Sequence, residues 1–198
     1  MIGVRPATLA DAAVVARIAV AGFYDDPVMR WVFPDDAVRP DRLRVLFSGL
    51  VDDMLPNRGV VHVGGDATAA LWRDPTFEHG RSAADRASEV TEEQPMPFSP
   101  DELERLMILG GTMMANHPHE PHWYLNVVST IPERQGQGLG SAVLQPVLEQ
   151  CDRDQDRAYL ESTNPRNHSL YHRHRFVDAG EIQLDGGPVM MAMWRDPR

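Results

Sequence analysis

The stretch 123–142, WYLNVVSTIPERQGQGLGSA, places an apolar run, a glycine-rich turn and the start of a helical pattern in direct succession. The apolar run ends at Pro132, and Gly136, Gly138 and Gly140 follow within the turn. This order leaves unpaired backbone N–H groups at a helix N-terminus, where the positive end of the helix dipole attracts an anion. Glycines let the main chain approach that anion without a Cβ in the way. The stretch therefore predicts a strand, a turn and a helix that together bind a diphosphate.

The spacing of the glycines narrows the choice of ligand. A mononucleotide P-loop requires a lysine, and all 19 basic residues of this chain are arginines. A dinucleotide fingerprint would begin at Gly136 and Gly138 but meets Ser141 where its last glycine belongs, and no apolar strand opens the chain. The pattern that remains is Gln135-x-x-Gly138-x-Gly140. An ordinary glycine-rich connection is the alternative that loop chemistry alone leaves open.

This pattern resembles the [RQ]xxGx[GA] signature of the GCN5-related N-acetyltransferase (GNAT) superfamily, in which the turn binds the diphosphate of acetyl-coenzyme A. Residues 159–176, YLESTNPRNHSLYHRHRF, are similar to the family's fifth strand, its tyrosine-bearing helix and the LYxxxGF pattern, although Arg175 stands where the family usually has glycine. Segments such as ALWRDP (70–75) and EPHWYL (120–125) look like the branch that contains puromycin N-acetyltransferase. The resemblance implies an α/β fold, with a mixed, mostly antiparallel sheet of about seven strands and flanking helices.

The resemblance also implies a binding site for acetyl-coenzyme A, which would serve as the acyl donor. The end of the central strand would pair through its backbone with the pantetheine arm, the turn would hold the diphosphate, and an asparagine would hold the pantetheine amide. In the order of these roles, the expected cofactor-binding residues are Val128, Ser129 and Thr130; Gln135, Gly136, Gln137, Gly138, Leu139 and Gly140; and Asn164.

Acyl transfer to an amine needs a proton for the departing thiolate and a base for the amine. Tyr171 matches the family's helix tyrosine, and a phenol with a pKa of about 10 stays protonated at neutral pH. Glu161 is the first candidate for the base. His122 and Glu120 are the next candidates, and Asp25 or Asp26 could instead recognise a cationic acceptor. For each acidic residue, a solvated surface position is the alternative.

Composition limits the classes of partner. The net charge of −10 argues against nucleic acid, and its excess of acids lies mainly in 1–131, which suits a cationic acceptor or only serves solubility. No apolar run approaches the roughly 20 residues that cross a bilayer, so we expect no membrane partner. The single cysteine, Cys151, agrees with a cytoplasmic location. The eight histidines lack the framework of a metal site, so no metal is predicted. A homodimer is left open.

Periodicity and capping signals predict the remaining elements, and the length predicts one domain over 1–198. Helices are expected from the capping pair Thr8 and Asp11 to residue 21, and over 40–55, 100–115, 137–152 and 165–173. Strands are expected at 2–6, 60–63, 67–72, 123–131, 158–162, 176–184 and 189–194. The polar stretch 74–98, with a weak helical pattern at 83–90, is either a long loop or a mobile lid.

The expected activity is transfer of an acetyl group from acetyl-coenzyme A to a primary amine of a small molecule, by direct attack in a ternary complex. A protein that binds or senses acyl-coenzyme A without turning it over is the alternative. The presence of both Tyr171 and Asn164 favours the enzyme.

Overall fold

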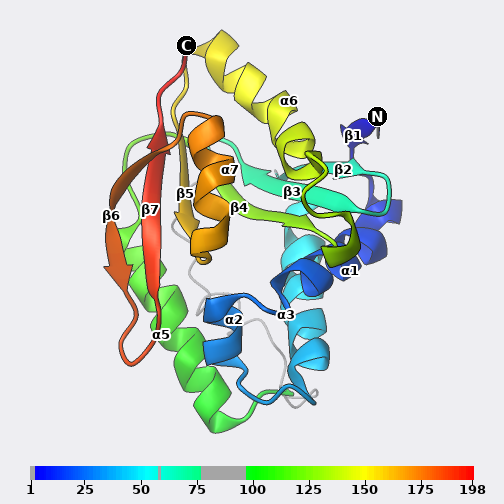
Figure 1. The fold of residues 1–198 in the computed structure, drawn as a ribbon, viewed down its shortest axis with the longest axis vertical. Coiled ribbons are helices and arrows are strands. Elements are labelled where there is room, and N and C mark those ends of the chain that lie inside the picture. Colours follow the sequence, from blue (N-terminus) through cyan, green and yellow to red (C-terminus); the bar gives the residue numbers. More distant parts are fainter. Residues whose placement is uncertain (1–2, 58, 77–96) are drawn as a thin grey trace.

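The computed structural model describes residues 3–57, 59–76 and 97–198 (Figure 1). One sheet of seven strands runs through the described part of the chain, in the order β1-β2-β3-β4-β5-β7-β6. The strands are β1 (Val4–Pro6), β2 (Gly59–Gly64), β3 (Thr68–Arg73), β4 (Trp123–Thr130), β5 (Ala158–Ser162), β6 (Val177–Gln183) and β7 (Val189–Arg195). All neighbouring strands are antiparallel except β4 and β5. The prediction of a mixed, mostly antiparallel sheet of seven strands is confirmed.

Helices cover both faces of this sheet. The described residues form α1 (Ala12–Phe23), α2 (Pro27–Val32), α3 (Arg39–Met54), α5 (Pro100–Asn116), α6 (Leu139–Asp154) and α7 (His168–Arg173). Apolar side chains of α1, α2, α3 and α5 share one core with strand residues such as Val63 and Val127. A second core joins α6 and α7 to the other face, through residues such as Trp72 and Leu160. Alternate residues of a strand therefore point into different cores, as the period of a strand requires.

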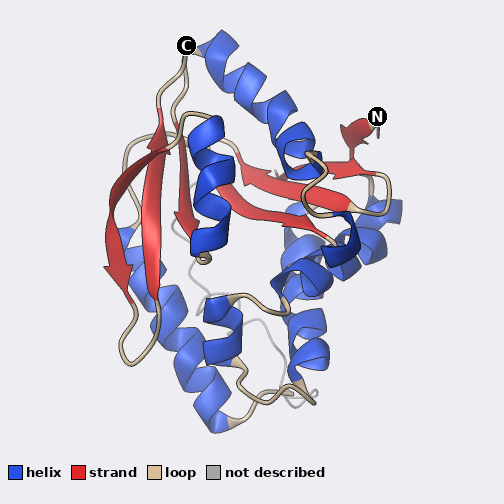
Figure 2. Ribbon diagram, in the orientation of Figure 1, coloured by secondary structure: helices blue, strands red, loops and turns tan. Residues whose placement is uncertain are grey.

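The two central strands separate after a short contact. β4 and β5 pair only at Trp123 with Ala158 and at Tyr124 with Tyr159. Beyond these pairs the remaining residues of β4 keep their pairing with β3, and β5 keeps its pairing with β7. Figure 2 shows the two groups of strands diverging beside α7. The divergence opens a gap in the middle of the sheet.

The helix that follows β4 begins two residues later than predicted. Gly138 is its N-cap, with a φ of 78°, and its buried residues recur at helical spacing: Leu139, Val143, Val147 and Cys151 among them. It ends at Gln155, which has a φ of 59°. Because Gly138 adopts a left-handed conformation, the helix cannot extend back to residue 137.

Two elements differ from the sequence-based expectation. The sequence pattern did not predict α2. This helix forms directly after α1 because Asp26 caps it and Pro27 occupies its first turn. The expected helix at 165–173 is a 3-10 turn, Pro165–Asn167, followed by α7. The predicted helix start at Ser99 is confirmed, with Ser99 and Glu102 forming a capping box.

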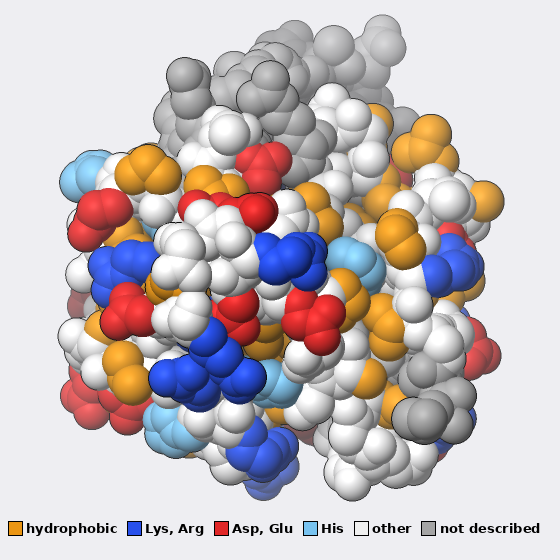
Figure 3. Space-filling model, turned by 90° about the horizontal axis from the view of Figure 1, so that it is seen from above, with side chains coloured by type: hydrophobic (Ala, Val, Ile, Leu, Met, Phe, Trp, Pro, Cys, Tyr) orange, Lys and Arg blue, Asp and Glu red, His pale blue; other side chains and the backbone are white. Residues whose placement is uncertain are grey.

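Most of the stretch 74–98, for which a loop or lid was predicted, and the beginning of the strand predicted at 2–6 lie outside the described residues. Within the part that is described, no helix is long and apolar enough to cross a membrane. Figure 3 shows arginine and acidic side chains interspersed over the face seen from above. The acidic excess does not gather into a single patch on that face.

Candidate functional site

The glycine-rich turn between β4 and α6 is exposed, and hydrogen bonds from its own side chains stabilise it. The side-chain nitrogen of Gln135 donates to the carbonyl of Thr130 at 3.0 Å, and Arg134 Nε donates to Gln137 Oε1 at 3.0 Å. Gly136 and Gly138 have φ angles of 72° and 78°, and a Cβ on either would meet nothing within 4 Å. The turn therefore requires glycine for its backbone conformation and leaves open space beside it.

The N-terminus of α6 opens onto this space. The first intrahelical bond runs from the N–H of Ala142 to the carbonyl of Gly138 at 3.0 Å, so the amides of Leu139, Gly140 and Ser141 precede the helical ladder. With the helix dipole, these amides favour an anion. The turn thus presents exposed backbone amides at a helix N-terminus, and its role in binding a diphosphate stays a prediction.

The end of β4 borders the gap in the sheet. Ser129 is buried, and its hydroxyl donates to the carbonyl of Ile18 at 2.8 Å. The hydroxyl of Thr130 lies 2.9 Å from that of Thr68. Since both side chains have partners inside the protein, the main chain of Val128, Ser129 and Thr130 is the part that could pair with a ligand in the gap. A backbone role in binding pantetheine stays a prediction for these residues.

Tyr171 lies on α7, in the core that α6 and α7 share with the sheet. Its side chain is buried, with its ring edge-on to Phe176 at 6.1 Å between centroids. Burial raises the pKa of Tyr171 well above its usual value, and the negative charge of Asp26 raises it further. The phenol therefore stays protonated at neutral pH and can act as a proton donor.

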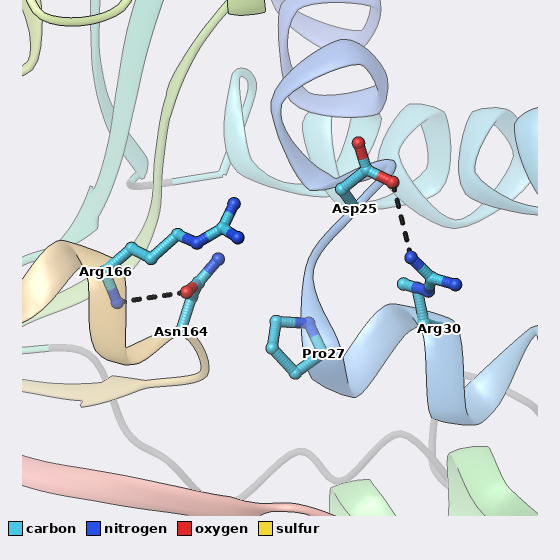
Figure 4. A pocket seen from close by; sticks show the side chains of 5 residues that line it. All are labelled: Asp25, Pro27, Arg30, Asn164 and Arg166. Carbon is cyan, nitrogen blue, oxygen red and sulfur yellow. Dashed lines mark hydrogen bonds and ion pairs between the residues drawn. The ribbon is translucent and has the colours of Figure 1, made fainter.

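Asn164 lies at the end of β5 and helps to form a pocket with a volume of about 340 Å³. Its side-chain oxygen accepts from the backbone N–H of Arg166 at 3.1 Å, which fixes the start of the 3-10 turn Pro165–Asn167. Asp25, Pro27, Arg30 and Arg166 complete the lining (Figure 4). Asp25 is exposed, lies 3.8 Å from Arg30 and lines the same pocket as Asn164.

Asp26 has a structural task, although it neighbours Asp25 in sequence. Its carboxylate accepts from the backbone N–H groups of Val28 at 2.9 Å and Met29 at 3.2 Å, and from the hydroxyl of Thr163 at 2.6 Å. Burial raises the pKa of this carboxyl, while these three bonds act against that increase. The carboxylate is thus occupied in joining α2 to the end of β5, and Asp25 is the better placed of the two to meet an acceptor.

Glu161 lies on β5 with its side chain only 1% exposed. Its Oε1 lies 3.5 Å from Nδ1 of His117, and the rings of Tyr124 and Tyr159 border the same space. His122 is also buried, its Nδ1 lies 2.6 Å from the carbonyl of Glu120, and burial lowers its pKa. Two of the candidates for the base, Glu161 and His122, are therefore neighbours in one cluster.

Sequence reasoning missed the other members of this cluster, namely His117, Tyr124, Tyr159 and Trp194. Tyr159 and Glu161 are two residues apart on a strand and so share a face, which was a usable signal. His117 comes from the end of α5, and nothing in the sequence links it to β5. The described residues contain no group of three or more side chains suited to hold a metal. Cys151 is buried, and burial raises the pKa of its thiol to about 12.

Comparisons with known proteins agree with this geometry. A model of the Acetyltransferase (GNAT) family matches residues 67–176. A solved structure from Corynebacterium glutamicum, described as histone acetyltransferase HPA2 and related acetyltransferase, is 28% identical, with a TM-score of 0.70 over 100% of this chain and 98% of that one.

More distant structures share the fold. An agmatine N-acetyltransferase is 13% identical, with a TM-score of 0.64 over 98% of this chain and 99% of that chain. A mosquito arylalkylamine N-acetyltransferase-like protein is also 13% identical, with a TM-score of 0.61 over 99% and 100% of the two chains.

Proposed function

The chain belongs to the acetyltransferase (GNAT) family, and from this premise we propose that it transfers an acetyl group from acetyl-coenzyme A to a primary amine of a small molecule. The reaction is direct attack in a ternary complex, carried out by residues 1–198 as one N-acetyltransferase domain. Two features support the proposal: the buried, protonated Tyr171 in the core that α7 shares with α6 and the sheet, and the glycine-rich turn that leads from β4 into α6. The sequence resemblance to the puromycin N-acetyltransferase branch supports a small acceptor.

The residues at the turn and the gap fit a coenzyme A thioester. Gly136 and Gly138 leave room for the diphosphate beside the N-terminus of α6. The main chain of 128–130 would pair with the pantetheine arm, and the side chain of Asn164 would bind its amide. The bound thioester supplies an activated acetyl group, and the chain orients it.

Two side chains would move protons. Glu161 takes a proton from the acceptor's ammonium, which frees the nitrogen lone pair to form the new C–N bond with the acetyl carbon. As the C–S bond breaks, Tyr171 donates its proton to the leaving sulfur. The new amide nitrogen then loses its surplus proton, which can return through solvent to the Tyr171 phenolate, and Glu161 releases the first proton to solvent. A backbone N–H of β4 can stabilise the negative charge that develops on the carbonyl oxygen between these steps.

The experiment combines a binding measurement with an activity measurement. Calorimetry with acetyl-coenzyme A should show saturable binding, and a screen of amines should release free thiol. Tyr171→Phe should lower kcat by about 100-fold or more while leaving the Kd for acetyl-coenzyme A unchanged, because the lost proton acts only in the transition state. Binding without thiol release over a broad panel would instead favour the non-catalytic acyl-coenzyme A binding protein.

A second variant tests the turn itself. Gly138→Glu places a carboxylate where the diphosphate would lie, and Gly138→Ala adds only a Cβ at the same positive φ. We expect Gly138→Glu to weaken acetyl-coenzyme A binding far more than Gly138→Ala, since both variants share the backbone strain and only one carries the charge. Equal affinities in the two variants would contradict the assignment of the turn.

A further inference from the structure

The carboxylate of Glu161 is buried, and the side chains of Tyr124 and Tyr159 form hydrogen bonds with it. Its Oε1 accepts no hydrogen bond from any residue that the structure describes, and Nδ1 of His117 lies 3.5 Å away. Burying a carboxylate is unfavourable unless hydrogen bonds and opposite charge compensate for the lost water. The position is therefore suited to a cationic group that can donate a hydrogen bond to Oε1.

Aromatic rings form walls around this carboxylate. The rings of Tyr124 and Tyr159 lie 6.2 Å apart at an interplanar angle of 30°. The ring of His117 stands edge-on to both, at 4.7 and 5.5 Å between centroids, and Trp194 lies 5.0 Å from Tyr159. Faces of aromatic rings attract ammonium groups, most strongly where water is excluded. We refer to Glu161 with these four residues as the aromatic chamber.

Electrostatics place the two tyrosine hydroxyls beside the carboxylate. Burial raises the pKa of Tyr124 and of Tyr159, and the negative charge of Glu161 raises both further. Both phenols therefore stay neutral at physiological pH. Neither phenol therefore adds to the negative charge that Glu161 brings to the chamber.

Glu161 lies on β5 two residues beyond Tyr159, where the pairing of β5 with β4 has ended. Tyr159 and Glu161 alternate with Ala158 and Leu160, which point into the core shared with α6 and α7. The chamber and the coenzyme turn thus lie on opposite faces of the sheet. Because β4 pairs with β5 only at Trp123 and Tyr124, no hydrogen bonds between these two strands close the sheet beside Glu161. An amine held by Glu161 would therefore face a thioester in the gap.

Two arginines lie near the aromatic chamber, and both are already paired with acidic residues. The positive charge of Arg73 acts to lower the pKa of Tyr124, and its guanidinium also donates to the carboxylate of Asp53 at 3.1 Å. Arg157 stacks on Trp194 at 4.2 Å and binds Asp196 at 2.8 Å. Both arginines are engaged with acidic residues, and a carboxylate brought beside Glu161 would meet like charge.

We propose that the acceptor is a small primary amine without a carboxylate, which enters the aromatic chamber as its ammonium and pairs with Glu161. The transfer of an acetyl group to this amine rests on the proposed function. The recognition of the amine rests only on the residues of the aromatic chamber. The aromatic chamber is expected to prefer an amine over the amino acid that differs from it only by a carboxylate.

Matched pairs of compounds test the proposal on the unmodified protein. Phenethylamine is compared with phenylalanine, and isoamylamine with leucine, because each pair differs by one carboxylate. Binding in the presence of coenzyme A is followed by tryptophan fluorescence, since Trp194 borders the chamber, and turnover is followed by thiol release. We expect the amine of a pair to bind at least about 100-fold more tightly than the amino acid.

Glu161→Gln supplies the second measurement, because it removes the charge and keeps the shape. The Kd for the amine should rise at least about 10-fold, and the preference over the amino acid should shrink. Glu181→Gln, an exposed position on β6, is the matched control and should change neither value. A folded Glu161→Gln variant with the original Kd and preference would overturn the proposal.

The outcomes separate the two proposals. Equal binding and turnover of amines and amino acids would refute the aromatic chamber and leave the acetyltransferase in place. Selective binding of amines without any thiol release would support the chamber and refute the acetyltransferase. The matched pairs need no variant, so the test stands even where Glu161→Gln fails to fold.

Discussion

The contact between α1 and β4 depends on one glycine. A Cβ on Gly22 would lie 2.1 Å from the hydroxyl oxygen of Ser129, 3.2 Å from the carbonyl of Thr130 and 3.3 Å from the Cβ of Ser129. The Ser129 hydroxyl donates to the carbonyl of Ile18 in the same helix, at 2.8 Å. Gly22→Ala must therefore displace this hydroxyl and push α1 away from β4.

The magnitude follows from three contributions. Overpacking of a well-packed core costs about 1–3 kcal/mol, and loss of the Ser129 hydrogen bond costs about 1 kcal/mol. Alanine in place of glycine within a helix stabilises the folded state by roughly 0.5–1 kcal/mol, which offsets part of this cost. We expect Gly22→Ala to lower the free energy of unfolding by about 2 kcal/mol. For a domain of this size, that corresponds to a decrease in Tm of about 4–8 °C.

Thermal and denaturant unfolding measure this change, with two controls. Gly49→Ala makes the same substitution within α3, where a Cβ would meet nothing within 4 Å, and should raise stability by about 0.5–1 kcal/mol. In a Ser129→Ala background the nearest clash is absent, so the cost of Gly22→Ala should fall by roughly half. A Gly22→Ala variant as stable as Gly49→Ala, or an equal cost in both backgrounds, would refute the reasoning.

Three further predictions concern single positions. Arg175 has a φ of 69° where the family usually has glycine, so Arg175→Gly should raise the free energy of unfolding by about 1 kcal/mol in denaturant titrations, and Arg175→Ala should not. Asp26→Ala removes three hydrogen bonds from a buried cap and should cost about 2–3 kcal/mol in the same assay; a cost below about 0.5 kcal/mol would contradict its structural task. Burial lowers the pKa of His122, so its stabilising effect is complete above about pH 6.5 and is lost as the pH falls through the lowered value. The Tm should therefore decline between pH 7 and pH 5, and His122→Gln should reduce that decline; an unchanged decline in the variant would count against the assignment.

Local signals predicted the turn, and they did so because its requirements are local. The positive φ angles of Gly136 and Gly138 and the start of α6 depend on residues within one short stretch, so the sequence carries them directly. The cap at Ser99 was predictable for the same reason.

Features that depend on distant partners could not be predicted in this way. Asp26 reads as a candidate for acceptor recognition until its bond to Thr163, 137 residues away, shows that its carboxylate is occupied. Likewise, His117 reaches Glu161 only after α5 and β5 have packed together. Residue type alone does not distinguish a helix cap from a ligand, or a surface acid from a buried one, because burial is a property of the folded chain.

The brief pairing of β4 with β5 has a mechanical consequence. Two residue pairs join the strands at the centre of the sheet, so the amides of β4 beyond Leu125 have no strand on their other side. A ligand that lies along this edge would form hydrogen bonds with these amides. It would thereby link the strands β1 to β4 with the strands β5 to β7. Slow hydrogen exchange at these amides would then report occupancy of the seam, independently of any chemistry.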